Sequence, residues 1–263
     1  MSEHHGSFIW YELMTADPAR AAAFYQAVHG WETKSSGVGA VEYHEITAAD
    51  GASVGGMLAL TDEMIAGGAA PAWFGYVCVD DVDAELAALK GAGGAELMDQ
   101  TVPGVGRMAL VADPQGIPIY LMAPQPPEGG ADAVSTAFSA DPGAVGHVAW
   151  NELTTPDPAG AKAWYLERFG WRHGGAMPMP GLGEYEFFQR GDVPLGAIMP
   201  RPDGQRTGWT FYWRTGDIDA AKARVEAAGG TPLHDIQQVP SDDYVLTCTD
   251  PEGAVFGLVG SRG

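Results

Sequence analysis

The sequence predicts an α+β protein that consists of two tandem copies of one domain. Each copy is expected to hold two βαβββ modules, whose strands form a curved mixed sheet with the helices on its outer face. Two observations support this prediction: the halves of the 263-residue chain repeat each other, and strand-like runs alternate with Ala-rich helical runs. The helical crossovers are too few for a doubly wound parallel sheet.

The internal repeat sets the predicted domain boundaries. The matching segments are Trp10–Pro18 with Trp150–Pro158, Gly30–Trp31 with Gly170–Trp171, Asp81–Asp83 with Asp217–Asp219, and Asp113–Gly116 with Asp250–Gly253. The segment between the copies is rich in Pro, Gly, Ala and Ser, as linkers are. We therefore predict a first domain over residues 6–123, a linker over 124–146 and a second domain over 147–260.

Within the first half, local signals predict the order of the elements. Asp17 is a good N-cap and Pro18 suits a first helical turn, so a helix should begin there, run to Val28 and end at Gly30. A second Ala-rich helix should begin at Asp81 or Asp83 and stop at Gly93. The predicted strands are 7–14, 41–47, 53–60, 74–79, 107–112 and 117–122, the last two flanking a turn at Asp113–Gly116.

Composition limits the partners and the compartment. The formal net charge is −20 and the pI is near 4.4, so the surface should repel nucleic acid. Cys78 and Cys248 lie at unrelated places in the two halves, which argues against a disulfide and fits a reducing cytoplasm. The first residues show no signal-peptide pattern, and no apolar run approaches the length of a membrane span. A cytoplasmic protein without a membrane or nucleic-acid partner is expected.

The order of these motifs, together with their doubling, resembles the vicinal oxygen chelate superfamily, in its glyoxalase/bleomycin-resistance/dioxygenase branch. The first motifs are the strand, the Asp-Pro helix with Phe24-Tyr25, and Gly30-Trp31. The Asp-Val-Asp helix, Gly104-Val-Gly-Arg107 and the Asp-Pro-Gln-Gly turn follow. The resemblance covers nearly the whole chain and implies paired modules whose sheets wrap into an open cup for a small molecule.

The same resemblance indicates where a metal would be held. Aligned with metal-dependent relatives, the ligand positions fall on Trp10, Phe74 and Tyr120 in the first half, and on Trp150, Thr210 and Gly257 in the second. None of these is a usual ligand for zinc, iron, nickel or manganese. We therefore predict no metal and no other cofactor, with a divalent metal as the minor alternative.

Two carboxylates are the candidate catalytic groups. Side chains alternate along a strand, so Glu12 should face the cup with Trp10, and Glu152 with Trp150. Burial beside an indole would raise the pKa of either carboxyl and make it a usable general base. The competing interpretation, a structural glutamate paired with an arginine or with backbone groups, is equally supported.

The predicted ligand-binding residues are Trp10, Tyr76, Arg107, Tyr120, Trp150 and Tyr212. Tyr76 and Tyr212 occupy matching places, and their phenols can bond a ligand or fill the core. Tyr43 and Tyr185 occupy places in the two halves that correspond only roughly. Arg107 should pair with Glu12 or hold an anion, and pairing is favoured because an unpaired buried charge is costly. The aromatic residues on the first helix of each half and at its exit are predicted to be core: Phe24, Tyr25, Trp31, Trp164, Tyr165 and Trp171.

Three functions remain open from the sequence. The first is a metal-free protein that binds a small, partly aromatic or cationic molecule between Trp and Tyr walls. The second is a glyoxalase-type lyase or isomerase, or a dioxygenase-related enzyme, in which Glu12 or Glu152 removes a proton. The third is a scaffold or regulator with a vestigial pocket. Duplication can complete the cups within one chain, so a monomer or a homodimer is expected.

Overall fold

The computed structural model describes residues 2–36, 41–125 and 135–263, so residues 126–134 of the predicted linker lie outside it. It confirms the predicted α+β class. The helices are α1 (Pro18–His29), α2 (Asp62–Ala66), α3 (Val82–Gly91), α4 (Pro158–Phe169) and α5 (Ile218–Ala227). The first-half strands are β1 (Phe8–Thr15), β2 (Glu32–Ser35), β3 (Tyr43–Thr47), β4 (Ser53–Ala59), β5 (Ala72–Cys78), β6 (Ala95–Val102), β7 (Gly106–Ala112) and β8 (Pro118–Pro124). The second-half strands are β9 (Val148–Thr155), β10 (Arg172–Met179), β11 (Gly183–Arg190), β12 (Val193–Pro200), β13 (Gly208–Arg214), β14 (Thr231–Pro232), β15 (Gln237–Gln238), β16 (Tyr244–Thr249) and β17 (Val255–Gly260).

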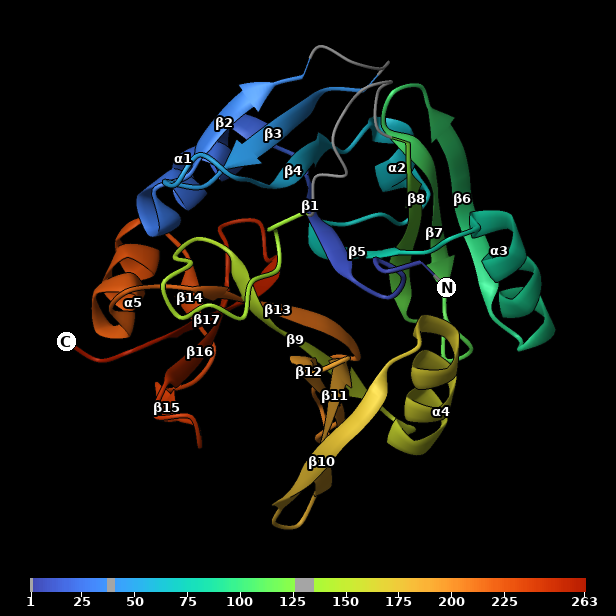
Figure 1. The fold of residues 1–263 in the computed structure, drawn as a ribbon. Coiled ribbons are helices and arrows are strands. Elements are labelled where there is room, and N and C mark those ends of the chain that lie inside the picture. The colour runs from blue at the N-terminus through green and yellow to red at the C-terminus, as the bar shows by residue number, and fades with distance from the viewer. Residues whose placement is uncertain (1, 37–40, 126–134) are drawn as a thin grey trace. The chain divides into compact units, whose positions relative to one another are not determined.

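The two sheets share one topology. The first runs β2-β3-β4-β1-β5-β8-β7-β6 and the second runs β10-β11-β12-β9-β13-β17-β16-β14, with β15 beside β16. In each module the strand that precedes the helix pairs in parallel with the last strand, as β1 does with β4 and β13 with β17, and the later strands are antiparallel. This is the predicted βαβββ pattern, repeated four times (Figure 1).

The first helix of each half begins and ends where the sequence indicates. The Asp17 carboxylate accepts a hydrogen bond from the amide of Arg20, and Gly30 ends α1 at φ 75°. In the same way, the Asp157 carboxylate accepts a hydrogen bond from the amide of Gly160, and Gly170 ends α4 at φ 62°. Only glycine adopts this left-handed conformation without strain, which explains why both helices stop there.

The chain forms two compact units that do not follow the boundary between the repeats. Unit 1 combines Met1–Ile9, Gly75–Val134 and Asn151–Trp209, and unit 2 combines Trp10–Phe74, Ser135–Trp150 and Thr210–Gly263. Each unit therefore takes one module from each repeat. In unit 2, α1 of the first repeat packs against α5 of the second (Figure 1).

Each unit has an aromatic core. In unit 2, Tyr25 lies 5.5 Å from both Trp31 and Phe256, and Trp213 lies 4.6 Å from Trp31, between ring centroids. The core of unit 1 is formed by Phe8, Tyr165, Phe169, Trp171, Phe188 and Trp209. Such ring pairs contribute about 0.5–1.5 kcal/mol beyond the area that they bury. The predicted core role of the α1 and α4 aromatic residues is confirmed, except that Trp164 stays part-exposed.

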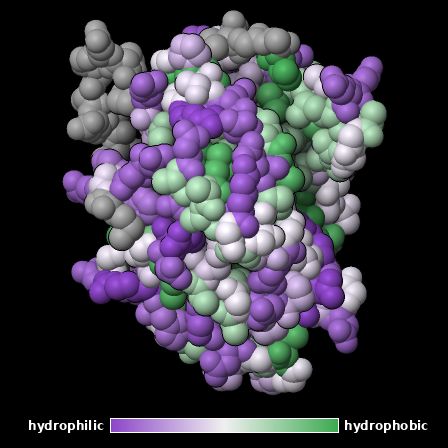
Figure 2. Space-filling view, turned by 90° about the vertical axis from the view of Figure 1, so that its right-hand side faces the viewer, coloured by the Kyte–Doolittle hydropathy of each residue, from purple (hydrophilic) through white to green (hydrophobic). Residues whose placement is uncertain are grey.

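Three first-half elements were not predicted: β2, α2 and β6. All three are short or strongly polar, and β6 is exposed along most of its length at the edge of its sheet. Edge strands bury little on either face and so lack the alternating hydrophobic pattern that identifies a strand. Hydrophilic residues are spread over the face in Figure 2 and are mixed with apolar ones. Among the described residues, no helix is long and apolar enough to cross a membrane.

Candidate functional site

The predicted site residues are divided between the two units. Unit 2 contains Trp10, Glu12, Trp150 and Tyr212, and unit 1 contains Tyr76, Arg107, Tyr120 and Glu152. Their roles in binding or catalysis stay predictions.

In unit 2, one face of the sheet formed by β13, β17 and β16 of the second repeat carries polar and aromatic side chains. Pairing aligns Tyr212 of β13 with Gly257 of β17, and Gly257 with Thr247 of β16. Residues paired in this way share a face of the sheet. The opposite face carries Phe211, Trp213, Phe256, Leu258 and Leu246, all with 0% exposure, and Phe256 meets Phe24 and Tyr25 of α1. We call the face turned away from α1 the open face; it carries Thr210, Tyr212, Arg214, Val245, Thr247, Gly257 and Val259, of which Thr210, Tyr212 and Val259 are only 6–7% exposed.

Tyr212 lies flat across the open face. A Cβ atom added at Gly257 would lie 2.3 Å from the Tyr212 ring, so the ring occupies the space that any side chain at position 257 would need. The phenol reaches the Thr247 hydroxyl at 3.3 Å. Trp150, part-exposed, packs against the cluster that contains Tyr212 and Val259. The predicted Trp150 and Tyr212 are therefore brought together.

The open face also carries a charged pair that the sequence analysis missed. Arg214 follows Tyr212 by two residues on β13, and its Nη1 donates a hydrogen bond to Asp243 Oδ2 at 3.0 Å. Both side chains are largely buried, with 11% and 26% exposure. Arg214 Nε is buried and has no hydrogen-bond acceptor among the described residues. Such a donor costs about 1–3 kcal/mol when it is left unsatisfied. Strand parity from Tyr212 was the signal that could have found Arg214.

The first repeat contributes a different arrangement to unit 2. The Trp10 indole donates to the Tyr43 hydroxyl at 2.8 Å, and a Cβ atom at Gly56 would lie 2.0 Å from that oxygen. Glu12 is paired in register with Gly56 and is only 4% exposed. Trp10, Tyr43 and Glu12 thus come from neighbouring strands, and a glycine makes room for the phenol.

In unit 1, the predicted tyrosines stack and the predicted carboxylate is bonded. Tyr76 and Tyr120 lie nearly parallel, with ring centroids 4.1 Å apart. The Tyr185 hydroxyl donates to Glu152 Oε2 at 2.7 Å. The equivalent phenols Tyr43 and Tyr185 therefore play opposite roles, since one accepts from an indole and the other donates to a carboxylate. The two repeats are not chemically equivalent.

Arg107 lies away from the tyrosines. Leu110 pairs with Tyr120, and Arg107 is three residues from Leu110, so its side chain points to the opposite face of β7. There its Nη2 lies 2.8 Å from Asp83 Oδ1 and 2.6 Å from Asp99 Oδ2. The sequence favoured an ion pair for Arg107, and the structure provides one with these two aspartates.

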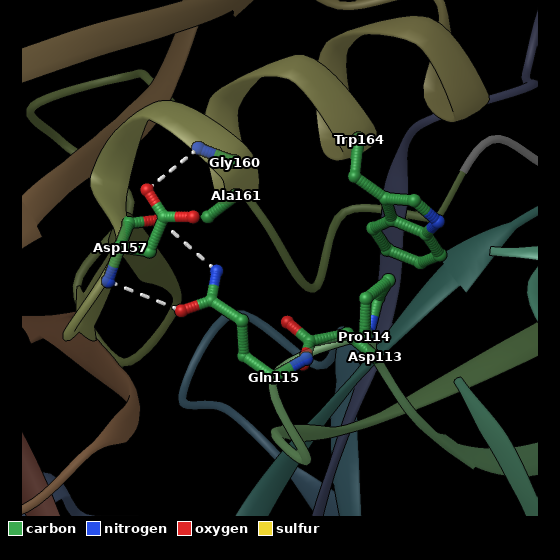
Figure 3. A pocket seen from close by; sticks show the side chains of 7 residues that line it. All are labelled: Asp113, Pro114, Gln115, Asp157, Gly160, Ala161 and Trp164. Atoms are coloured by element: carbon green, nitrogen blue, oxygen red, sulfur yellow. Dashed lines mark hydrogen bonds between the residues drawn. The ribbon is translucent and has the colours of Figure 1, made fainter. Parts of the chain in front are cut away.

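Unit 1 also has a small hollow of about 170 Å³ between the turn after β7 and the start of α4 (Figure 3). Gln115 is one of the lining residues, and its amide donates to the Asp157 carbonyl at 3.0 Å and accepts from the Asp157 amide at 3.1 Å. Ligand sites usually have volumes of about 300 Å³ or more. We interpret this hollow as part of the structural contact between the turn of one repeat and the helix of the other, and not as a ligand site.

Comparison with protein families identifies the chain. Residues 10–122 match the family model of the glyoxalase-like domain, and residues 144–258 match the model of the glyoxalase/bleomycin resistance protein/dioxygenase superfamily. The chain belongs to this superfamily. It is 29% identical over 262 residues to the Mycobacterium tuberculosis protein named "Putative glyoxylase CFP32", covering 95% of this chain and 93% of that one. It is 32% identical over 131 residues to the anthracycline biosynthesis protein DnrV of Streptomyces peucetius, covering 44% of this chain and 47% of DnrV.

Solved structures of the superfamily share the fold. Homoprotocatechuate 2,3-dioxygenase of Arthrobacter globiformis aligns with a TM-score of 0.66 at 16% identity, covering 98% of this chain and 80% of the dioxygenase. The 2,2',3-trihydroxybiphenyl 1,2-dioxygenase of Sphingomonas wittichii aligns with a TM-score of 0.65 at 15% identity, covering 99% and 91%. At these identities the likeness concerns the fold alone.

The residues at the positions where the resemblance places metal ligands are not usual metal ligands. In the second repeat the three positions, Trp150, Thr210 and Gly257, all lie in unit 2 and offer an indole, a hydroxyl and no side chain at all. The first-repeat positions carry two aromatic rings and a phenol, from Trp10, Phe74 and Tyr120. Zinc, iron, nickel and manganese bind mainly to imidazole, carboxylate and thiolate groups. Across the part of the chain that the structure describes, no group of three or more His, Cys, Asp or Glu side chains could hold one.

Proposed function

We propose that this protein binds a small, partly aromatic molecule through organic side chains, without the metal centre of its metal-dependent relatives. The position of Tyr212 carries the proposal. Its ring fills the place of the side chain at position 257, where the resemblance places a metal ligand in metal-dependent relatives. A site with an aromatic ring in that space is suited to apolar and stacking contacts.

The rest of the open face supports an organic ligand. Ligand sites are mostly apolar and aromatic, with a few polar groups that fix the orientation of the ligand. Here Trp150 and Tyr212 supply the rings, Val245 and Val259 the apolar surface, and Thr247 a hydroxyl. The relative DnrV is named an anthracycline biosynthesis protein, and this name is in keeping with an organic ligand.

Binding of 2-naphthamide tests this function. Isothermal titration with the full chain should show saturable binding of this planar, uncharged probe. Trp150→Ala should weaken the binding about 10-fold, because the loss of one aromatic contact corresponds to about 1.4 kcal/mol. Trp150 is part-exposed, so its truncation should leave the fold intact.

Trp164→Ala is the matched control, because Trp164 is also part-exposed but lies on α4 beside the small hollow. It should bind the probe with unchanged affinity. Absence of saturable binding, or equal weakening by both substitutions, would contradict the proposal.

A glyoxalase-type lyase is the second candidate, because Glu12 places a carboxylate with only 4% exposure beside Trp10 and Tyr43. Turnover of a hemithioacetal by the native protein, lost in Glu12→Gln, would favour this lyase over a binding protein.

A further inference from the structure

Arg214 is held firmly at the end of the open face. Its amide donates to the His147 carbonyl at 2.8 Å, and its carbonyl accepts from the Gly146 amide at 2.9 Å. The side chain projects from the same face as Tyr212, one pleat repeat farther along β13, and the strand rise places the two Cα atoms about 7 Å apart. An arginine in this place is close to the aromatic part of the open face.

Asp243 occupies only one side of the guanidinium. It contacts Nη1, and the edge formed by Nε and Nη2 remains for another acceptor. The turn that carries Asp243 is unusual, because Asp242 has a φ of 65°, the one positive φ at a residue other than glycine in the described ranges. Strained backbone of this kind persists where the surroundings over-determine it, and it is concentrated at functional sites. The turn positions Asp243 so that it orients the guanidinium but does not saturate it.

We propose that the open face binds an aromatic carboxylate, with the Nε–Nη2 edge of Arg214 as the anchor for the carboxylate. The two N–H groups of that edge match the two oxygens of a carboxylate in a planar, bidentate pair. The ring of the ligand lies against Tyr212 and Trp150, about 7 Å away along the strand direction. The proposal rests on the proposed function, since it assigns the charge of the molecule that the same face binds.

The matched probes 2-naphthoate and 2-naphthamide separate the two proposals, because they share their ring system and differ in charge. Isothermal titration of the full chain should show that naphthoate binds at least about 10-fold more tightly than naphthamide, as expected for a charge-assisted bidentate contact. Arg214→Gln/Asp243→Asn removes the pair without leaving a buried charge alone, and it should reduce this preference to within about 2-fold while naphthamide still binds.

Asp243→Asn alone should change the preference for naphthoate over naphthamide, which a purely structural ion pair would not affect. It removes the carboxylate that neutralises Arg214, so the preference for naphthoate should increase by about 3-fold or more. Arg20→Gln, which removes an equal charge from the exposed surface of α1, should leave the preference unchanged. If naphthamide binds but naphthoate binds no better, or if Asp243→Asn lowers the preference, the carboxylate anchor is wrong and the proposed function stands. If neither probe binds, both proposals fail.

Discussion

Lowering the pH from 7 to 3.5 is expected to remove about 2–4 kcal/mol from the free energy of unfolding through His29 alone. Its ring stacks on Trp31, with centroids 4.4 Å apart, and Nε2 is buried without a hydrogen-bond partner among the described residues. Burial first, and the charge of Arg224 second, lower the pKa of His29 from 6.5 to about 3. The full shift corresponds to about 5 kcal/mol, and we expect less because His29 is part-exposed.

Acid lowers the stability of the folded chain because the folded and unfolded chains bind different numbers of protons. Between pH 6.5 and 3 the unfolded chain protonates His29 and the folded chain does not, so acid favours unfolding across that window. Urea unfolding curves measured at several pH values check this. His29→Phe keeps a flat aromatic ring on Trp31 and cannot titrate, so the loss of stability on acidification should be smaller by about 2–4 kcal/mol. Equal pH dependence in the two proteins would show that His29 does not control acid stability.

Replacing either of the two buried turn aspartates, Asp250 or Asp113, with alanine should lower the free energy of unfolding by about 3–5 kcal/mol. Asp250 accepts from the amides of Glu252 and Ala254 and from the Tyr25 hydroxyl, and is 4% exposed. Burial raises the pKa of this carboxyl, although its hydrogen bonds oppose the rise. Asp250→Ala leaves three donors without an acceptor in the interior of unit 2. Denaturant unfolding monitored by tryptophan fluorescence measures the loss.

Asp113 occupies the same place in unit 1, where it accepts from the amides of Gln115 and Ile117 and from the Tyr165 hydroxyl. Asp113→Ala should therefore have an effect of similar size. Asp141→Ala is the matched control, because Asp141 accepts from the Gly143 amide in an exposed turn and should cost less than about 1 kcal/mol. Equal effects of the buried and exposed substitutions would contradict this account.

These aspartates also show what the sequence could and could not predict. The Asp-Pro starts and the glycine stops at Gly30 and Gly170 are local signals, and they correctly predicted the ends of the first helix of each half. The internal repeat predicted the doubled fold. The Tyr25–Asp250 and Tyr165–Asp113 contacts join a helix of one repeat to a turn of the other. Local periodicity carries no information about which repeat a turn will contact, so the composition of the two compact units could not be predicted.

The candidate site was predicted in a similarly uneven way. Strand parity predicted that Trp150 shares a face with Glu152, whereas the structure packs Trp150 against the cluster that contains Tyr212. Arg107 was predicted to pair with Glu12, and it pairs with Asp83 and Asp99 instead. Asp243 lies in a loop that shows no strand pattern, so nothing in the sequence linked it to Arg214. Likewise, the sequence did not show that Tyr43 bonds Trp10 whereas Tyr185 bonds Glu152, because that difference depends on side-chain orientation.

We propose that no metal ion is held where the Tyr212 ring fills the space of a side chain at position 257. The most direct measurement is the metal content of the full chain after exposure to zinc, iron, manganese and nickel and subsequent dialysis, combined with 2-naphthamide titration before and after chelation. We predict a substoichiometric metal content and an unchanged affinity for the probe. One tightly held ion per chain, whose removal abolishes probe binding, would contradict the account.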